Sequence, residues 1–226
     1  MSESTKEPQY RFLLELEAKE GLQQFGLMSS QVWRDDPRRL GFVLSRHKFV
    51  AKMFTGLNKV LEVGCADGFF TRVVRQEVPN VAATDFDPVF DERNRARVDA
   101  KWPIDFRVHD MIAGPLAENS DGVYSVDVLE HIPKADERKF IGNMAASLHD
   151  AGVCIVGSPS LESQAYASPP SKAGHVNCKS APELRVLMQS FFKNVFLFSM
   201  NDEVVHTGYH AMAHYLFALC CGPKRS

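Results

Sequence analysis

Residues 60–68 read Val60-Leu61-Glu62-Val63-Gly64-Cys65-Ala66-Asp67-Gly68 and decide the fold of this 226-residue chain. An apolar run enters a turn of small residues, and a helical pattern of apolar residues follows. This order is typical of the strand–turn–helix unit that opens a nucleotide-binding α/β domain. Asp85 stands 21 residues after Gly64, at the end of the next apolar run, where a carboxylate can bind the hydroxyls of a ribose.

The spacing of the turn separates two classes of ligand. A dinucleotide site requires Gly-x-Gly-x-x-Gly, and the chain places Gly64, Ala66 and Phe69 at those positions. A Gly-x-Gly-x-Gly turn fits better, because Gly68 supplies its last glycine and Ala66 is the mildest replacement for the middle one. The spacing therefore disfavours a nicotinamide oxidoreductase.

Acidic residues stand at or near the carboxyl ends of the predicted strands, namely Glu62, Asp67, Asp85 and Asp110. Together they would repel a pyrophosphate, which prefers a bare helix N-terminus. The same charges suit a ligand that carries a sulfonium and an α-ammonium group.

These residues give the chain a family resemblance. From about residue 40 to residue 220 it resembles the class I S-adenosylmethionine-dependent methyltransferases, on the basis of residues 61–68, Asp85, residues 108–111 (Val-His-Asp-Met) and residues 121–132. The last segment, Asp-Gly-Val-Tyr-Ser-Val-Asp-Val-Leu-Glu-His-Ile, is similar to the fourth-strand motif of the ubiquinone-biosynthesis type of O-methyltransferase. Ala66 departs from the family's middle glycine. The resemblance implies S-adenosylmethionine as cofactor and the strand order 3-2-1-4-5-7-6 with an antiparallel last strand.

Strand and helix patterns alternate along the rest of the chain. We expect strands near residues 60–63, 81–84, 104–108, 123–126, 153–156, 195–199 and 211–219. The alternation predicts an α/β, Rossmann-like fold in which helices cover both faces of a seven-stranded, mainly parallel sheet. We expect residues 1–40 to form an N-terminal tail and small helical cap, and residues 41–226 to form the methyltransferase domain.

The composition argues against several classes of function. A net charge of −2 creates no basic field for nucleic acid or anionic membrane, and the chain lacks the acid–Pro–Pro–aromatic turn that grips a flipped base. No apolar run approaches the ~20 residues that span a bilayer, and the polar N-terminus is unlike a signal peptide. The five cysteines show no C-x-x-C spacing, which argues against zinc and a disulfide framework. We therefore expect a cytoplasmic protein without nucleic-acid or membrane partners; a homodimer is one open alternative.

The cofactor site is expected at the carboxyl ends of the strands. There the turn backbone faces the methionine and ribose, Glu62 orients the turn, and Asp85 binds the ribose hydroxyls. Phe86 or Met111 packs on the adenine, Asp110 accepts from its amine, and Asp127 lies beside the methionine. The predicted cofactor residues are Glu62, Gly64, Cys65, Ala66, Gly68, Asp85, Phe86, Asp110, Met111 and Asp127. Cations at residues 38–52 are expected on a solvated helix face, with a contact from Arg46 or Lys48 to the cofactor carboxylate as the alternative.

Methyl transfer to a hydroxyl needs an aligned nucleophile and a proton acceptor. His131 is the leading candidate for the base because it follows Glu130 at the exit of the fourth strand, and His175 is another. The ubiquinone-type enzymes bind a divalent ion through an acid–x–x–Glu–His cluster, which Asp127, Glu130 and His131 match. By that resemblance, magnesium or manganese is an alternative cofactor.

Two polar loops are expected over the active-site end of the sheet. The first, residues 158–179, carries Tyr166, His175 and Asn177, and the second carries His206, Tyr209 and His210. They favour a small hydroxylated acceptor, such as a sugar or a secondary-metabolite-like molecule. N-methylation, methylation of a protein, and a non-catalytic cofactor-binding partner protein remain the alternatives.

Overall fold

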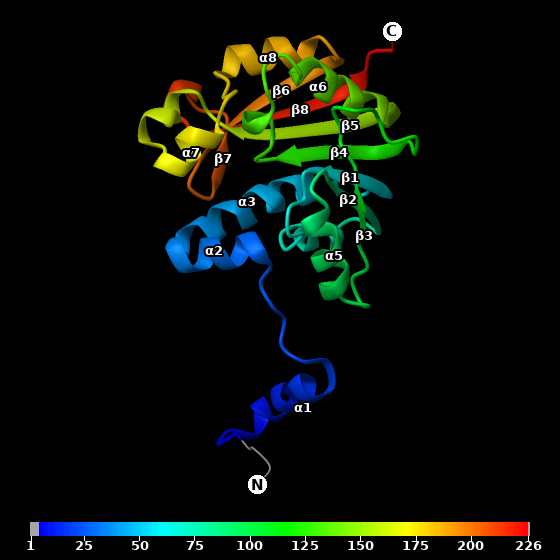
Figure 1. The fold of residues 1–226 in the computed structure, drawn as a ribbon, viewed down its shortest axis with the longest axis vertical. Helices are drawn as coiled ribbons and strands as arrows, with labels where there is room; N and C mark the ends of the chain where they lie inside the picture. The colour runs from blue at the N-terminus through cyan, green and yellow to red at the C-terminus, as the bar shows by residue number, and fades with distance from the viewer. Residues whose placement is uncertain (1–4, 226) are drawn as a thin grey trace.

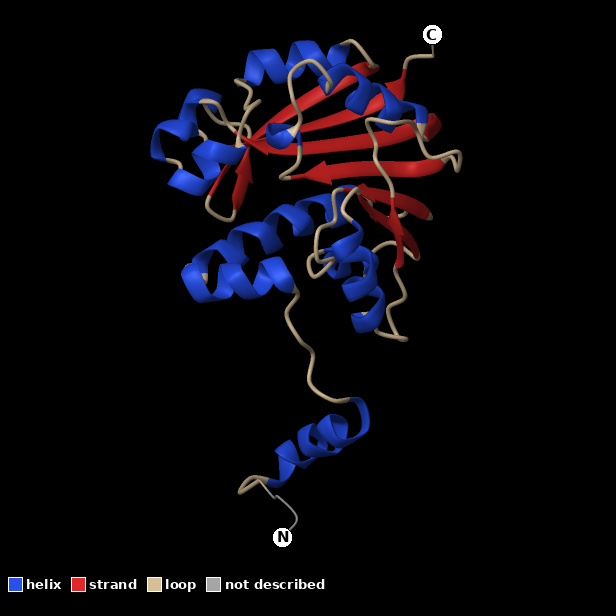
Figure 2. Cartoon of the chain, viewed as in Figure 1, coloured by secondary structure: helices blue, strands red, loops and turns tan. Residues whose placement is uncertain are grey.

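A computed structural model describes residues 5–225, so the first residues of the expected N-terminal tail lie outside it. Its centre is one sheet with the strand order β3-β2-β1-β4-β5-β8-β6-β7 (Figures 1 and 2). Neighbours from β3 to β5 are parallel, whereas β8 runs antiparallel to both β5 and β6. The strands are β1 (Lys59–Val63), β2 (Asn80–Asp85), β3 (Asp105–Val108), β4 (Ser120–Val126), β5 (Leu148–Pro159), β6 (Phe192–Asn201), β7 (Val204–His206) and β8 (Tyr215–Pro223).

Helices cover both faces of the sheet, which confirms the expected α/β architecture. Successive side chains of a strand point to opposite faces, so Val60 packs with α3 (Arg38–Met53) and α4 (Thr71–Arg75), and Leu61 packs with α6 (Glu137–Ala146) and α8 (Ala181–Gln189). The remaining helix of the crossover region, α5 (Pro88–Arg97), contacts β2 and β3. The parallel strands therefore all end at one edge, where the predicted site residues lie.

The sheet has one strand more than the sequence predicts. β7 pairs antiparallel with β6 through Ser199↔His206, in the segment expected to be a loop between the last two strands. β7 has three residues, and an alternation of apolar and polar side chains over so short a segment is not enough to predict a strand. The segment 158–179 also contains secondary structure, namely the 3-10 helix η3 (Glu162–Tyr166) and the short helix α7 (Pro169–Gly174).

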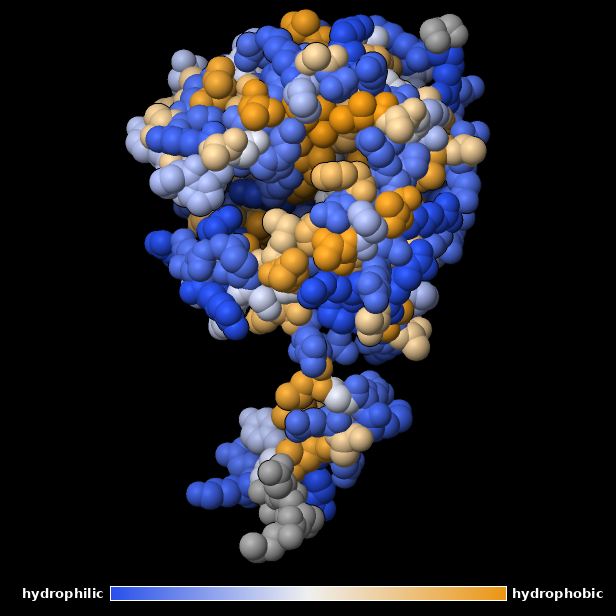
Figure 3. Space-filling view, in the orientation of Figure 1, coloured by the Kyte–Doolittle hydropathy of each residue, from blue (hydrophilic) through white to orange (hydrophobic). Residues whose placement is uncertain are grey.

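The N-terminal region contains a packed part and an extended part. The helix α2 (Leu27–Asp35) packs on α3, whereas the 3-10 helix η1 (Pro8–Tyr10) and α1 (Arg11–Glu20) form an arm that extends from the body (Figure 1). No residue of η1 or α1 is buried, and apolar side chains gather on this arm (Figure 3). In the described residues, no helix combines the length and the apolar character required to cross a membrane.

Candidate active site

The turn after β1 is held in a left-handed backbone conformation. Gly64, Ala66 and Gly68 have φ values of 82°, 45° and 62°, which glycine adopts without strain and alanine does not. The Gly64 and Cys65 amides both donate to the Thr84 carbonyl, at 2.8 and 2.9 Å, and so fix the turn to the end of β2. A Cβ on Gly64 would lie 2.3 Å from a methyl of Val128, so this position excludes any side chain.

Asp85 at the end of β2 braces the same turn. Its two carboxylate oxygens accept from the Ala66 amide at 2.9 Å and from the Asp87 amide at 3.0 Å. Burial raises the pKa of Asp85 above its ordinary value. Each carboxylate oxygen has a second lone pair, so Asp85 can hold the turn and still accept from two hydroxyls.

The other predicted cofactor residues differ in their surroundings. Phe86 is 75% exposed and Asp110 is exposed, with one Asp110 oxygen accepting from the Ile112 amide at 2.8 Å. Met111 is buried in the core on the α6 side of the sheet. Glu62 is buried with its Oε1 3.3 Å from Nε2 of His47. Their roles toward a cofactor stay predictions.

The helix α2 covers the turn, a feature that the sequence did not reveal. Asp67 Oδ2 accepts from both the amide and the hydroxyl of Ser29, at 2.7 and 2.8 Å, so this carboxylate holds α2 in place. Gly26 precedes the helix where an added Cβ would lie 2.3 Å from the same oxygen. The partner Ser29 is 38 residues from Asp67, and no local pattern marks the pair.

A cavity of about 340 Å³ lies between the turn after β1 and the helices α2 and α3. Its walls combine the turn, α2, α3 and the residues that follow β4 and β5, and its lining includes Met28, Val32, Arg39, Phe42, Val43, Arg46, His47, Gly64, Cys65, Ala66, Asp67, Phe70, Asp127, Glu130, His131, Ser171 and His175. The apolar residues from α2 and α3 were not predicted as site residues. Apolar residues that recur at helical spacing are equally typical of ordinary core packing, so the sequence pattern does not mark them as site residues.

Arg46 reaches into this cavity, so the expectation of a solvated side chain was wrong. One guanidinium nitrogen donates to both carboxylate oxygens of Asp127, at 2.8 and 2.7 Å, and the guanidinium carbon lies 3.9 Å from the centre of the Tyr215 ring. Its side chain is only 14% exposed. Burial acts to lower the pKa of Arg46, but Asp127 and Tyr215 outweigh it and raise that pKa. Asp127 itself has a φ of 60°, which is strained for a residue with a side chain.

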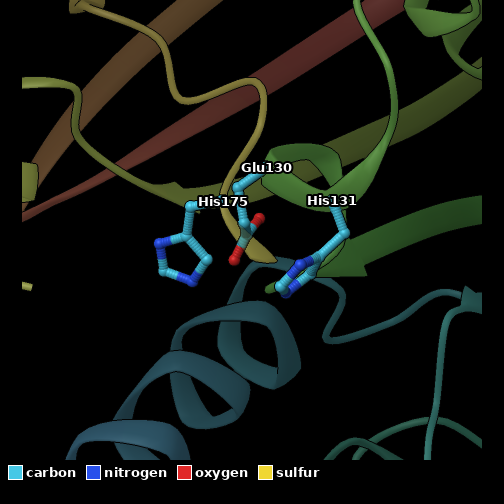
Figure 4. A group of neighbouring side chains, drawn as sticks. All are labelled: Glu130, His131 and His175. Carbon is cyan, nitrogen blue, oxygen red and sulfur yellow. The ribbon is translucent and has the colours of Figure 1, made fainter. Parts of the chain in front are cut away.

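Glu130, His131 and His175 form a cluster at the same cavity (Figure 4). A 3-10 helix, η2 (Leu129–His131), presents the first two, and His175 follows α7. One ligand atom from each of the three lies within 4.8 Å of the others, and the two imidazole rings flank the Glu130 carboxylate (Figure 4). All three residues were predicted from the sequence as site residues. Their proximity was not, because it depends on the contact between His131 and Gly174, which are 43 residues apart in the chain.

Hydrogen bonds define the protonation of the two imidazoles. His131 Nδ1 lies 2.9 Å from the Gly174 carbonyl oxygen, and His175 Nδ1 lies 2.9 Å from the side-chain oxygen of Gln164. Both partners only accept, so each Nδ1 carries a proton and each neutral ring has its lone pair on Nε2. Burial lowers the pKa of His175, and a proton on the neighbouring His131 ring would lower that pKa further, so the neutral form of His175 is favoured.

Glu130 has an unusual carboxyl group. It is 1% exposed, and its Oε2 is buried without a hydrogen-bond partner. Burial and the charge of Asp127 raise the pKa of Glu130 to about 8. Burial therefore favours the protonated carboxyl group, and loss of its proton would create a buried carboxylate that a cation in the cavity would neutralise.

The five predicted acceptor residues lie outside the lining of this cavity. Tyr166 and Tyr209 are 92% and 70% exposed, and His210 follows Tyr209. His206 lies in the β7 hairpin, where its ring bonds Asn201 Oδ1 and the Gly208 amide, both at 2.9 Å. Asn177 is buried and bonds Glu137. Their contact with an acceptor stays a prediction.

Comparison with known proteins gives the family. Residues 23–191 match the family described as "Methyltransferase domain". A probable S-adenosylmethionine-dependent methyltransferase of Mycolicibacterium smegmatis is 28% identical over 134 residues, which cover 58% of this chain and 50% of that protein. The chain thus matches about half the length of this relative.

Solved structures agree in fold. The N-methyltransferase NodS from Bradyrhizobium japonicum, in complex with S-adenosyl-L-homocysteine, has a TM-score of 0.63 at 23% identity, covering 84% of this chain and 93% of its own. An O-methyltransferase family protein from Burkholderia thailandensis has a TM-score of 0.64 at 13% identity, covering 88% and 60%. The likeness to the ubiquinone-biosynthesis type rests on the sequence motif alone. The chain belongs to the class I S-adenosylmethionine-dependent methyltransferases.

Proposed function

We propose that this chain transfers the methyl group of S-adenosylmethionine to a hydroxyl of a small polar acceptor, such as a sugar or a secondary-metabolite-like molecule. The glycine turn and Asp85 would hold the cofactor. The cavity lined by Asp127, His131 and His175 would receive the acceptor. The family supports the cofactor, and the 340 Å³ cavity beside the turn suits a small acceptor rather than a protein segment.

The two Nε2 lone pairs of His131 and His175 carry the proposal for a hydroxyl. A hydroxyl attacks the methyl carbon in line with the departing sulfur, and its proton must be taken up as the new C–O bond forms. Nε2 of His131 would accept this proton, with His175 as the second acceptor. The sulfonium becomes a neutral thioether, and the imidazole becomes an imidazolium.

The test measures release of S-adenosylhomocysteine with a panel of sugars, phenols and amines, for the wild type and the His131→Gln/His175→Gln double variant. We expect release with a hydroxylated acceptor, and a roughly 100-fold or larger fall in kcat for the double variant. His149→Gln is the matched control, because His149 pairs with Asp121 at the start of β5, where the neighbouring parallel strands also begin. Turnover of amines alone, or an unchanged kcat, would contradict the hydroxyl assignment.

As the alternative to proton acceptance by the imidazoles, we propose that Glu130, His131 and His175 hold a divalent cation, because an Nε2 lone pair that binds a cation cannot also take up the proton. The donor set fits, because Glu130 Oε2 is buried without a partner and each imidazole is oriented by a hydrogen bond from Nδ1, as is usual for metal-binding histidines. Asp127, the third ligand expected from sequence, is paired with Arg46. Two imidazoles and one carboxylate favour manganese over magnesium. A bound cation would supply Lewis-acid activation of an acceptor hydroxyl.

Calorimetric titration of Mn²⁺ into the metal-free protein tests this site without any acceptor. Because Glu130 must lose its proton to bind, we expect tighter binding at pH 8.5 than at pH 6.5. Glu130→Gln should abolish binding. Equal binding by this variant would exclude Glu130 as a ligand.

A further inference from the structure

The segment that brings His175 to the active site is fastened by a buried ion pair. Lys179 Nζ lies 2.5 Å from Glu137 Oε2, and the two side chains are 7% and 13% exposed. Lys179 Nζ also donates to Asn177 Oδ1 at 2.5 Å, and Asn177 Nδ2 donates to Glu137 Oε2 at 3.0 Å. The three side chains therefore form a closed network, which we call the Lys179 latch.

The Lys179 latch is connected directly to the catalytic cluster. The Asn177 amide donates to the carbonyl of Glu130 at 3.0 Å, and the Lys179 carbonyl accepts from the Leu161 amide at 2.9 Å. Glu137 belongs to the first turn of α6, six residues after His131. One network thus joins both ends of the long segment to the helix that follows Glu130 and His131.

Besides this network, His175 is positioned by hydrogen bonds from its own segment and from the cluster: its Nδ1 donates to Gln164 Oε1, and the Gly174 carbonyl accepts from His131 Nδ1, both at 2.9 Å. The segment from 161 to 178 forms no strand, and its isolated bridge to the sheet region is Ser160↔Lys179. The exposed fraction of Val176, the residue next to His175, is 61%, so apolar packing does not hold this part of the chain. Burying a lysine is costly unless it is paired and hydrogen-bonded, and at Lys179 both conditions are met.

We propose that Lys179 is a positioning residue that, through Glu137 and Asn177, holds His175 against Glu130 and His131. It acts through the backbone of residues 175–179 and touches neither cofactor nor acceptor. The inference rests on the proposed function for its consequence in catalysis, whereas the arrangement itself can be measured without any acceptor. It also gives Asn177, expected from sequence to contact the acceptor, a place inside the network.

The test uses the full chain with isotope-labelled histidine and measures the nuclear Overhauser effect between the rings of His131 and His175. Their centroids are 5.2 Å apart in an edge-to-face arrangement, so the wild type should give cross-peaks. Lys179→Met should abolish these cross-peaks. Lys179→Arg keeps the positive charge and can donate to both Glu137 and Asn177, so it should restore the cross-peaks at least in part. Affinity for S-adenosylhomocysteine, measured by calorimetry, should stay within about twofold in both variants, because the turn and Asp85 are untouched.

Lys59→Met is the matched control, since Lys59 pairs with Glu118 at the start of β1, at 2.7 Å on the protein surface. It should keep the cross-peaks. If Lys179→Met does not fold, Glu137→Gln weakens the same latch while keeping its shape and should reduce the cross-peaks. Retained cross-peaks in a folded latch variant would overturn the proposal, as would their equal loss in Lys59→Met.

Activity then separates this inference from the proposed function. If a hydroxylated acceptor is found, Lys179→Met should lower kcat at least tenfold while the KM for S-adenosylmethionine is unchanged, and Lys179→Arg should recover activity. If only amines are methylated, the hydroxyl proposal fails while the ring contacts still decide the role of Lys179. A kcat unchanged by loss of the ring contacts would show that the position of His175 is irrelevant to turnover.

Discussion

The glycine turn and the Glu130–His131–His175 cluster border the same cavity but are assembled differently. The turn, its brace Asp85 and the carbonyl of Thr84 lie within one strand–turn–helix–strand unit. The cluster needs η2, the end of a long irregular segment and a latch to α6. Local backbone geometry therefore builds the end of the cavity where we propose that the cofactor binds, whereas long-range side-chain contacts build the end that we propose for the acceptor.

The largest effect on cofactor binding is expected from Gly64→Ala, which disrupts the backbone of the turn after β1. A φ of 82° strains any residue with a side chain by roughly 1–3 kcal/mol, and the added Cβ also overlaps Val128. We expect binding of S-adenosylhomocysteine to become undetectable by calorimetry and the melting temperature to fall. Gly114→Ala is the control, because a Cβ there meets nothing within 4 Å. Wild-type affinity in Gly64→Ala would show that the turn is not the cofactor site.

The second prediction concerns Arg46, which belongs to the long-range half of the site. Arg46→Met would leave the partly buried Asp127 without its guanidinium partner, which should lower the free energy of unfolding by about 3 kcal/mol. Arg38→Met removes an exposed pair with Asp36, which water screens, so its free energy of unfolding should stay close to that of the wild type. Urea denaturation measures both. Equal losses would mean that the Arg46–Asp127 pair contributes no more than a surface pair.

This division also explains what could be predicted from the sequence. The apolar runs, the glycine spacing and Asp85 are local signals, and they correctly gave the parallel strands and the turn. The burial of Arg46 was missed because helical periodicity places it among lysines and arginines, while its partners Asp127 and Tyr215 lie 81 and 169 residues further along the chain. The contacts of Lys179 with Glu137 and Asn177 have no periodic signal at all, since they join a helix to an irregular segment.

Asp85→Ala provides a third, smaller test within the turn half. Loss of hydrogen bonds from ribose hydroxyls to a charged group costs about 1.5–3 kcal/mol, so affinity for S-adenosylhomocysteine should fall roughly 10- to 100-fold. The loss of the Ala66 brace acts in the same direction. Asp150→Ala is a control, because that exposed carboxylate pairs with Arg225 away from the cavity lining. Unchanged affinity in Asp85→Ala would contradict the proposed ribose contact.

The last effect is a pH dependence that originates at the cluster. Glu130 has a pKa of about 8 in the folded protein, against about 4.3 for an unperturbed glutamate, so the folded state holds a proton that the unfolded state releases between these values. The wild type should therefore lose stability as pH rises through this window. Glu130→Gln keeps the shape and cannot ionise, so its stability relative to the wild type should increase progressively between pH 5 and pH 8.5. Urea denaturation in the presence of a chelator measures this difference. A difference that is constant with pH would mean that Glu130 is ionised in the folded protein, and the buried carboxyl group would then depend on Arg46 rather than on a proton for its stability.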